Sequence, residues 1–572
     1  MAADPDVRTY VRYAALRPRL WRPQRPDLTP HGIEYPDDAG DLPLRFTAPR
    51  PLEWFSLITA SAEADLRLAS TTLKAARFDA LPWRMHFEDL ENESSLHRFA
   101  WLLPWMLEQR RQGTSASSLW ERAAAAMRDW IRAHPGPTAS EAWQSYTLSE
   151  RLVNWIIATL ALGSFPPGED VMASITTQAE HLSGSLEHYG PLFTGNHLSN
   201  NGRALYFAGI VAERLDLASV GRVILRHERA RLFSRNGFLR EGSAHYQFLV
   251  TRNYAEVLWL AETCGDVAFR DELRVTLPKL RGACEFFLVQ GAKPRIPLIG
   301  DLSPDCTPEW LLGVASEVRE GWREFFPEAG WAAQHVSETS EWARVDSGGW
   351  AVIAHVNPRG APLVPSHAHH DTGGITAFLD GEPVIVDCGR KHYMDDAVGR
   401  FGLSGWAHSL LMVDGLNPEP RDRWFLARDF LQRRIGARPE IVAADRTIRI
   451  THHGYQRSPG VGVCSREVAV TNDELCVVDS VAGSGFHRLA LVFHLPNGTA
   501  RGSSVEFRAG DKTITLQLPA DLRRVRAVTA SDDGTFGWAT PRYGKQIPVT
   551  SVIAEARVRL PWRGASTFRI HP

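Results

Sequence analysis

The chain has 572 residues, of which 44% are hydrophobic and 23% are charged, and its formal net charge at pH 7 is −2. A chain of this length exceeds what one hydrophobic core usually supports, so two or more domains are expected. The small net charge predicts no general attraction to nucleic acid or to anionic membranes. A polyanionic ligand would therefore have to be held by a local group of arginine and lysine side chains.

The six cysteines are scattered and form no C-x-x-C pair, which predicts free thiols rather than a disulfide framework. The N-terminus has no apolar segment typical of an export signal, and no run reaches the roughly 18 apolar residues of a membrane span. We therefore expect no membrane insertion. The expected location is cytoplasmic for the chain as written, or periplasmic if a signal has been removed.

Residues 1–90 are rich in proline and arginine and are expected to form irregular structure with short helices. In the region 91–335, apolar residues recur at three-to-four spacing, which predicts amphipathic helices. The expected helices are 96–112, 116–134, 140–162, 170–189, 196–215, 220–235, 243–264 and 269–290. Such a series with short connections predicts a helical toroid or bundle.

The periodicity changes to two in the region 340–572. Alternating apolar residues separated by turn residues predict strands at 349–356, 409–415, 446–451, 467–471, 475–479, 489–494 and 512–518. A run of antiparallel strands of this kind should pack as a β-sandwich. The expected fold is therefore α+β and multidomain, with helices first and strands after them.

The segment 367–371, which reads His-Ala-His-His-Asp, is the most distinctive motif. If the chain is extended there, its first, third and fifth side chains share one face. Two further candidate ligands follow it, Asp387 directly after the predicted strand 383–386 and His408. Together these groups indicate a catalytic or metal-binding site.

The helical region contains a polar stripe. Asn196, Asn200 and Arg203 are spaced at i, i+4 and i+7, so they share one side of a predicted helix. A helix cap with a solvated face is the alternative interpretation. A second segment, Arg240 to Tyr246, begins a helix with a tyrosine in its first turn. Considered alone, a tyrosine at such a position usually packs in the hydrophobic core or at its edge.

In combination and in this order, these motifs resemble those of the bacterial heparinase II/III-like polysaccharide lyases. The segments that carry the resemblance are 195–209, 241–246, 300–305, 367–371, 386–389 and 407–415. The resemblance extends over residues 80–480. It implies an incomplete (α/α) toroid followed by an antiparallel β-sandwich, with the active site between them, in agreement with the change of periodicity.

The resemblance implies cleavage of a uronic-acid-containing polysaccharide or oligosaccharide by β-elimination. In this reaction a base takes the C5 proton, an acid protonates the leaving oxygen, and the sugar carboxylate must be neutralised. By resemblance, Asn196 and His197 neutralise the carboxylate, Tyr246 is the general acid, and His367 is the partner base. Whether Tyr246 or His367 removes the proton depends on the uronate epimer.

The resemblance also implies a structural zinc ion held by His369, Asp387 and His408, and no organic cofactor. A ligand set of two imidazoles and one carboxylate suits zinc. The ion would stiffen the sheet edge that positions His367. A metal-free arrangement joined by hydrogen bonds is the alternative.

Arg203 and Arg240 are candidates for clamping substrate carboxylates, because a planar guanidinium matches a carboxylate bidentately. Asn200 lies on the same predicted stripe as Arg203. Arg151 falls on a helix that the family uses to line its cleft. Structural ion pairs are the alternative for Arg203 and Arg240.

Two rival functions remain open. A glycoside hydrolase would use a carboxylate pair drawn from Glu241, Asp301 and Asp305. A non-catalytic carbohydrate-binding protein, or an accessory protein of exopolysaccharide biosynthesis, would keep the groove without turnover. The chain also departs from the family pattern at residues 402–406 and 409–410.

Overall fold

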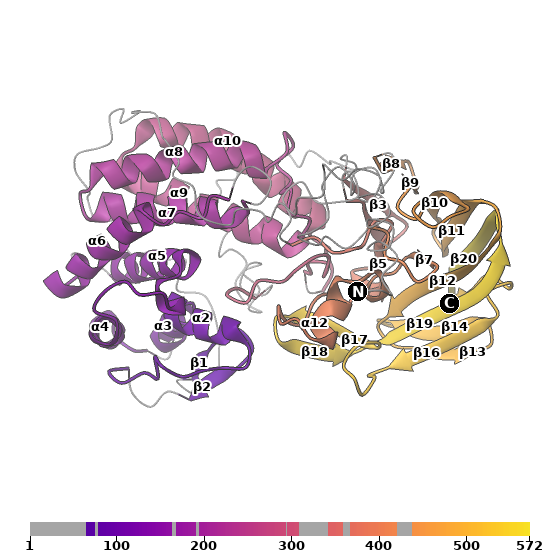
Figure 1. Cartoon of the computed structure of the whole chain (residues 1–572), viewed down its shortest axis with the longest axis horizontal. Helices are drawn as coiled ribbons and strands as arrows, with labels where there is room; N and C mark the ends of the chain where they lie inside the picture. The colour runs from indigo at the N-terminus through magenta and orange to yellow at the C-terminus, as the bar shows by residue number, and fades with distance from the viewer. Residues whose placement is uncertain are drawn as a thin grey trace, which may run out of the picture.

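The computed structural model describes residues 65–74, 78–111, 113–162, 167–189, 194–292, 294–307, 341–357, 367–419 and 438–571. Within these ranges a short hairpin is followed by a series of helices and then by strands, among which lies the short helix α12 (Ala397–Leu403) (Figure 1). Most of the predicted N-terminal extension, and the predicted domain boundary between 335 and 340, lie outside the described residues. The described end of the extension contains a small hairpin, β1 (Asp65–Arg67) and β2 (Thr72–Lys74).

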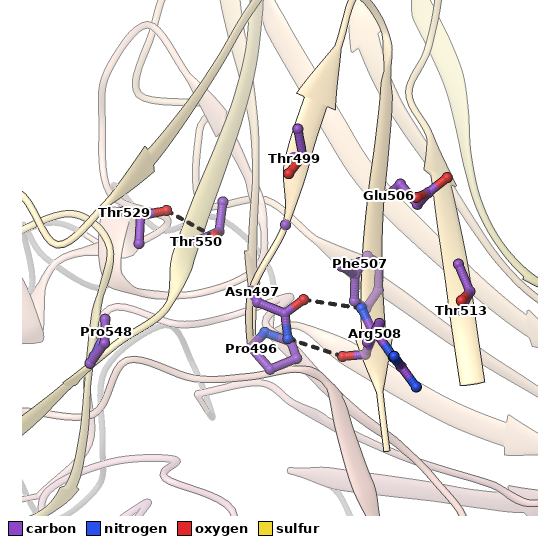
Figure 2. Close-up of a pocket in the computed structure, with 11 residues that line it drawn as sticks. Pro496, Asn497, Thr499, Glu506, Phe507, Arg508, Thr513, Thr529, Pro548 and Thr550 are labelled. Atoms are coloured by element: carbon purple, nitrogen blue, oxygen red, sulfur yellow. Dashed lines mark hydrogen bonds between the residues drawn. The ribbon is translucent and has the colours of Figure 1, made fainter. Parts of the chain in front are cut away.

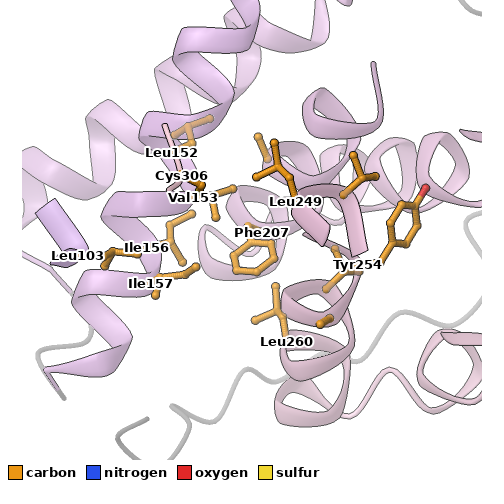
Figure 3. Packing of buried hydrophobic residues seen from close by; sticks show 14 of the residues in the cluster. Leu103, Leu152, Val153, Ile156, Ile157, Phe207, Leu249, Tyr254, Leu260 and Cys306 are labelled. Atoms are coloured by element: carbon orange, nitrogen blue, oxygen red, sulfur yellow. The ribbon is translucent and has the colours of Figure 1, made fainter. Parts of the chain in front are cut away.

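The helical region is built in two layers. Its described helices are α2 (Leu90–Arg98), α3 (Leu102–Arg111), α4 (Ala116–Ala133), α5 (Ser145–Ala161), α6 (Glu169–Ser183), α7 (Asn196–Val211), α8 (Leu215–Leu232), α9 (Ala244–Cys264) and α10 (Val267–Phe287). Helices α5, α7 and α9 are buried along nearly their whole length, and their side chains meet in the core shown in Figure 3. Helices such as α4 and α10 bury one face only, so they pack outside this layer.

Beyond the hairpin β1–β2, the described strands form three larger antiparallel sheets and a second hairpin. A four-stranded sheet has the order β3 (Trp342–Ser347), β4 (Trp350–His355), β5 (Ile375–Leu379), β6 (Glu382–Ile385). An eight-stranded sheet has the order β13 (Thr499–Arg501), β14 (Ser504–Ala509), β15 (Lys512–Gln517), β20 (Trp562–His571), β11 (Glu474–Gly483), β10 (Val461–Val470), β9 (Thr447–His452), β8 (Glu440–Ala444). The third sheet has the order β16 (Arg524–Thr529), β19 (Thr550–Arg559), β12 (Phe486–Leu495), β7 (Leu411–Val413). The hairpin joins β17 (Trp538–Arg542) and β18 (Lys545–Pro548).

The sheet β3–β6 joins the two regions of the chain. Ile353 and Phe378 pack in the hydrophobic core of the helices, whereas their neighbours Val352 and Leu379 pack in the core of the sandwich. Successive side chains of a strand point to opposite faces, so this sheet is covered on both sides. The predicted α+β fold of helices followed by an antiparallel β-sandwich is confirmed. No described helix is both long and apolar enough to cross a membrane.

Candidate active site

Three segments meet where the helical region contacts the strands. The Asp301 N–H donates to the carbonyl of His367 at 2.9 Å, and the Ala244 N–H donates to the carbonyl of Ile299 at 3.0 Å. Gly242, with φ of 70°, makes this approach possible, because a Cβ there would lie 2.6 Å from the Cβ of Ala368. The start of α9 is thereby held against the segment that carries His367.

Tyr246 and His367 form the centre of the site. Tyr246 lies in the first turn of α9, where its N–H donates to the capping hydroxyl of Ser243 at 3.1 Å. Its ring stacks on the imidazole of His367, with 3.4 Å between the ring centroids and 16° between the planes. Burial raises the pKa of Tyr246 well above its ordinary value, so its hydroxyl keeps its proton at neutral pH.

Asn196 connects these rings to helix α7. The carboxylate of Glu241 caps this helix in place of a side chain from α7 itself, accepting from the Asn196 backbone N–H and from Nδ2, both at 2.8 Å. Asn196 Nδ2 also lies 3.1 Å from His367 Nε2. Because an amide nitrogen is a donor only, His367 Nε2 is the acceptor in this bond and carries a lone pair.

Asp301 holds the opposite side of the His367 ring. Its Oδ2 lies 3.3 Å from His367 Nδ1, and its Oδ1 lies 3.0 Å from His369 Nε2. Arg390 approaches both carboxylate oxygens at 3.4 Å. Burial opposes the charge, but the bonds from the two histidines and the guanidinium charge keep the pKa of Asp301 below its ordinary value. The ionised Asp301 therefore fixes the His367 proton on Nδ1 and leaves Nε2 available as a base.

His197 is the exposed member of the predicted catalytic set. Its side chain is 42% exposed, and its Nδ1 lies 2.9 Å from Glu187 Oε1. Its ring packs on Tyr146, with 4.2 Å between centroids. Burial of part of the ring opposes its charge, but Glu187 outweighs this and raises the pKa of His197 above its ordinary value. An imidazolium next to Asn196 suits the binding of a carboxylate.

The structure gives two predicted substrate-binding arginines a different role. Arg203 is buried and pairs with Glu150 at 2.7 Å and with Glu256 at 2.9 Å. Arg151 is also buried, and its guanidinium lies 3.8 Å from the centre of the Trp130 ring. Both side chains are enclosed by other helices, so they stabilise the helical core rather than face a ligand.

The other two predicted substrate-binding residues are Arg240 and Asn200. Arg240 is partly buried in the connection that leads to α9. Asn200 is 1% exposed, and neither of its amide atoms has a hydrogen-bond partner within the part of the chain that the structure describes. Their role in binding a substrate stays a prediction.

The predicted zinc ligands lie near one another. His408 Nδ1 is 2.7 Å from Asp387 Oδ2, and the rings of His369 and His408 are 5.3 Å apart. His369 Nδ1 and His408 Nε2 are buried without a hydrogen-bond partner in the described ranges, which favours a metal. However, no three His, Cys, Asp or Glu side chains among the described residues are arranged to hold an ion. Zinc stays a prediction, and no step proposed below depends on it.

Sequence reasoning missed three residues of the site. Tyr393 bonds through its hydroxyl to that of Tyr246 at 2.9 Å, and the guanidinium of Arg390 lies 4.9 Å from the centre of the Tyr393 ring. Glu187 sets the charge of His197. Each is a single residue outside any recognisable motif, although Arg390 directly follows the segment 386–389 that carries the family resemblance.

A separate pocket lies on the sandwich, away from these residues. It has a volume of about 590 Å³ and is lined by residues of strands β13 to β16, β18 and β19 and of the segment before β13 (Figure 2). Its Asn497 is fixed by hydrogen bonds to the backbone of Arg508 at 3.0 and 3.2 Å. Because Glu506 and Arg508 are both exposed and no predicted site residue lines it, we place the candidate active site at the junction instead.

Comparison with known proteins agrees with this architecture. A crystal structure of heparinase III superposes with a TM-score of 0.65 at 16% identity, covering 86% of this chain and 79% of that one. A mutant of the heparan sulfate lyase HepC from Pedobacter heparinus superposes with a TM-score of 0.55 at 15% identity, covering 98% of this chain and 87% of that one. A search of curated proteins found no match.

These superpositions define the class of fold, a helical toroid followed by an antiparallel β-sandwich. Residues 326–570 match the family model described as heparinase II/III-like, C-terminal. The resemblance noted in the sequence is therefore confirmed, and residues 326–570 are similar to the C-terminal part of the heparinase II/III-like family.

Proposed function

We propose that the protein is a polysaccharide lyase that cleaves a uronic-acid-containing polysaccharide by β-elimination. The observation that carries this proposal is the convergence of Tyr246, His367 and Asn196 at the junction of the two regions. A protonated phenol, an imidazole with a free lone pair and an amide donor are the groups that this elimination needs.

Each group has a role that follows from its surroundings. His367 Nε2 takes the C5 proton, and Tyr246 gives its proton to the leaving oxygen. His197 and Asn196 neutralise the uronate carboxylate. The amide hydrogens of Asn196 are held by Glu241 and His367 in the free protein, so one of these two bonds is exchanged when the carboxylate binds.

The glycoside hydrolase alternative is weaker because its candidate carboxylates are engaged by other groups. Glu241 caps α7, and Asp301 is kept ionised by its two histidines and Arg390. Burial raises the pKa of Asp305 to about 6, but two bonds from Arg98, at 3.2 and 3.0 Å, hold this carboxyl. A hydrolase needs one protonated and one ionised carboxyl at the scissile bond, and all three side chains are buried.

The mass of the product tests the proposal. The protein is incubated with a panel of uronic-acid polysaccharides, and the fragments are analysed by mass spectrometry and ultraviolet absorbance. Elimination gives fragments with a conjugated double bond and without an added water. Fragments that carry an added water would support a hydrolase, and binding without any cleavage would support the accessory protein.

A further inference from the structure

We infer that Tyr393 is a positioning residue that acts through Tyr246: it orients the Tyr246 hydroxyl before reaction and stabilises its phenolate after proton transfer. Only the chemical step in this inference rests on the proposed function. The hydrogen-bond geometry on which it is based belongs to the protein without substrate.

The direction of the hydrogen bond between the two tyrosines follows from a count of protons. The Tyr393 hydroxyl donates to the backbone carbonyl of Leu302 at 2.8 Å, and it lies 2.9 Å from the Tyr246 hydroxyl. Each hydroxyl has one hydrogen. Since the hydrogen of Tyr393 is given to Leu302, Tyr246 is the donor and Tyr393 the acceptor between the two rings. In the free protein, the proton of Tyr246 therefore points at Tyr393.

The same pair can reverse its bond during the reaction. His367 takes the C5 proton, and the C4–O4 bond breaks as the C4–C5 double bond forms. Tyr246 turns its hydrogen from the Tyr393 oxygen to O4 and gives this proton to the leaving group. Tyr246 is then a phenolate, and the Tyr393 hydroxyl can turn from the Leu302 carbonyl to donate to it. Tyr393 keeps its own proton throughout. The proton held by His367 returns to Tyr246, and this transfer restores both residues.

The charges around Tyr246 explain why such a donor is needed. Tyr246 is buried, and the carboxylates of Asp301, Asp305 and Glu91 oppose a phenolate there. A hydrogen bond donated by Tyr393 to the phenolate favours the ionised form and so lowers the pKa of Tyr246. A hydrogen-bond donor placed where negative charge develops is an effective form of catalytic stabilisation.

The position of Tyr393 does not depend on its own hydroxyl. Its backbone N–H donates to the Tyr543 hydroxyl at 3.1 Å, and the Tyr543 hydroxyl donates to Asp89 at 3.2 Å. Its ring packs edge-on against that of Tyr543, with 5.2 Å between centroids, and Arg390 lies over its face. These contacts fix the ring, so Tyr393→Phe removes the hydroxyl and leaves the ring in place.

Neutron diffraction on crystals of the deuterium-exchanged protein tests the geometry without any substrate. We expect the deuteron of Tyr246 to lie on the line to the Tyr393 oxygen, and that of Tyr393 to point to the Leu302 carbonyl. A Tyr393 deuteron directed at Tyr246 in the free protein would overturn the inference. This result does not depend on activity, so it is separate from failure of the proposed function.

Kinetics of Tyr393→Phe tests the role. With the polysaccharide that gives an unsaturated product, we expect kcat to fall by about 10²-fold while KM changes little. The matched control is Tyr455→Phe, which removes a buried tyrosine hydroxyl bonded at 2.7 Å to the Leu411 carbonyl within the sandwich. Unchanged kcat in Tyr393→Phe, or an equal loss in the control, would overturn the inference.

Discussion

The rings of Tyr246 and His367 lie parallel, with 3.4 Å between their centroids, although one residue belongs to helix α9 and the other to the segment that precedes β5. Tyr246 is held by its helix and His367 by Asp301. The distance between the two rings therefore depends on the contact between the helical region and the strands. A shift of one region relative to the other would separate the two groups.

Replacing Asp301 should reduce turnover more than binding. In Asp301→Asn no carboxylate holds the His367 proton on Nδ1. The tautomer with a free lone pair on Nε2 is then no longer favoured, so kcat should fall by about 10²–10⁴-fold. Asp305→Asn is the control, since Asp305 bonds to Arg98 and not to His367. Steady-state kinetics compares the two variants, and a larger loss in Asp305→Asn would favour the hydrolase.

Glu187→Gln should change the pH dependence of activity. Glu187 raises the pKa of His197 against the effect of burial, so the imidazolium persists to higher pH in the wild type than an unpaired ring would. Without the carboxylate, the alkaline limb of kcat/KM should move to lower pH. A limb that stays in place would show that His197 does not supply the charge that binds the carboxylate.

The pair formed by Glu187 and His197 should affect the free energy of unfolding in a defined pH window. A raised histidine pKa contributes stability that is complete below the unfolded value of about 6.5 and is lost as the pH rises through the folded value. The difference in unfolding free energy between wild type and Glu187→Gln should therefore be larger at pH 5 than at pH 9. Urea unfolding at the two pH values measures it, and a difference that grows with pH would contradict the assignment.

Arg203→Met should affect stability rather than substrate binding. The substitution leaves Glu150 and Glu256 buried without their cation, and losing one partner of a buried ion pair typically costs about 3–5 kcal/mol. Chemical denaturation measures this loss, and KM of the folded protein should be unchanged. Arg240→Met is the comparison, because Arg240 is less buried. A raised KM at full stability in Arg203→Met would restore the substrate-binding role.

The proposed zinc is tested by elemental analysis of the purified protein. If His369, Asp387 and His408 bind the ion, the wild type contains zinc, His408→Asn contains less, and a chelator lowers Tm of the wild type. His245→Asn is a control histidine variant, because His245 is buried in α9 outside this set. Wild-type protein that is free of metal and has a Tm unaffected by the chelator would support the hydrogen-bonded alternative.

The fold was predictable because the periodicity of apolar residues changes from helix to strand along the chain. The predicted helix 96–112 is in fact two helices, α2 and α3, separated at Phe99, whose φ of 54° is left-handed. No glycine or proline at this position signals the break. Strand β4 is buried on both faces, so it lacks a polar alternation, and its contact with two cores could not be predicted from its own residues.

The ordered motifs predicted a grouping of Asn196, Tyr246 and His367, which lie together in the structure, and their catalytic roles stay predictions. The choice between substrate binding and a structural ion pair could not be made for Arg203 from the sequence, because residue type alone does not show a partner. Arg203 pairs with Glu150 of α5 and Glu256 of α9, both distant in sequence. Such pairing is visible only once the helices are packed.

The most direct test of the account is the absorbance of the unsaturated product during incubation with uronic-acid polysaccharides, using wild type, Tyr246→Phe and Tyr254→Phe. Tyr254 lies on the same helix α9, and its hydroxyl bonds at 3.0 Å to the Leu225 carbonyl, away from His367. The account predicts that the absorbance rises with wild type and Tyr254→Phe and is lost with Tyr246→Phe. An undiminished rise with Tyr246→Phe would contradict it.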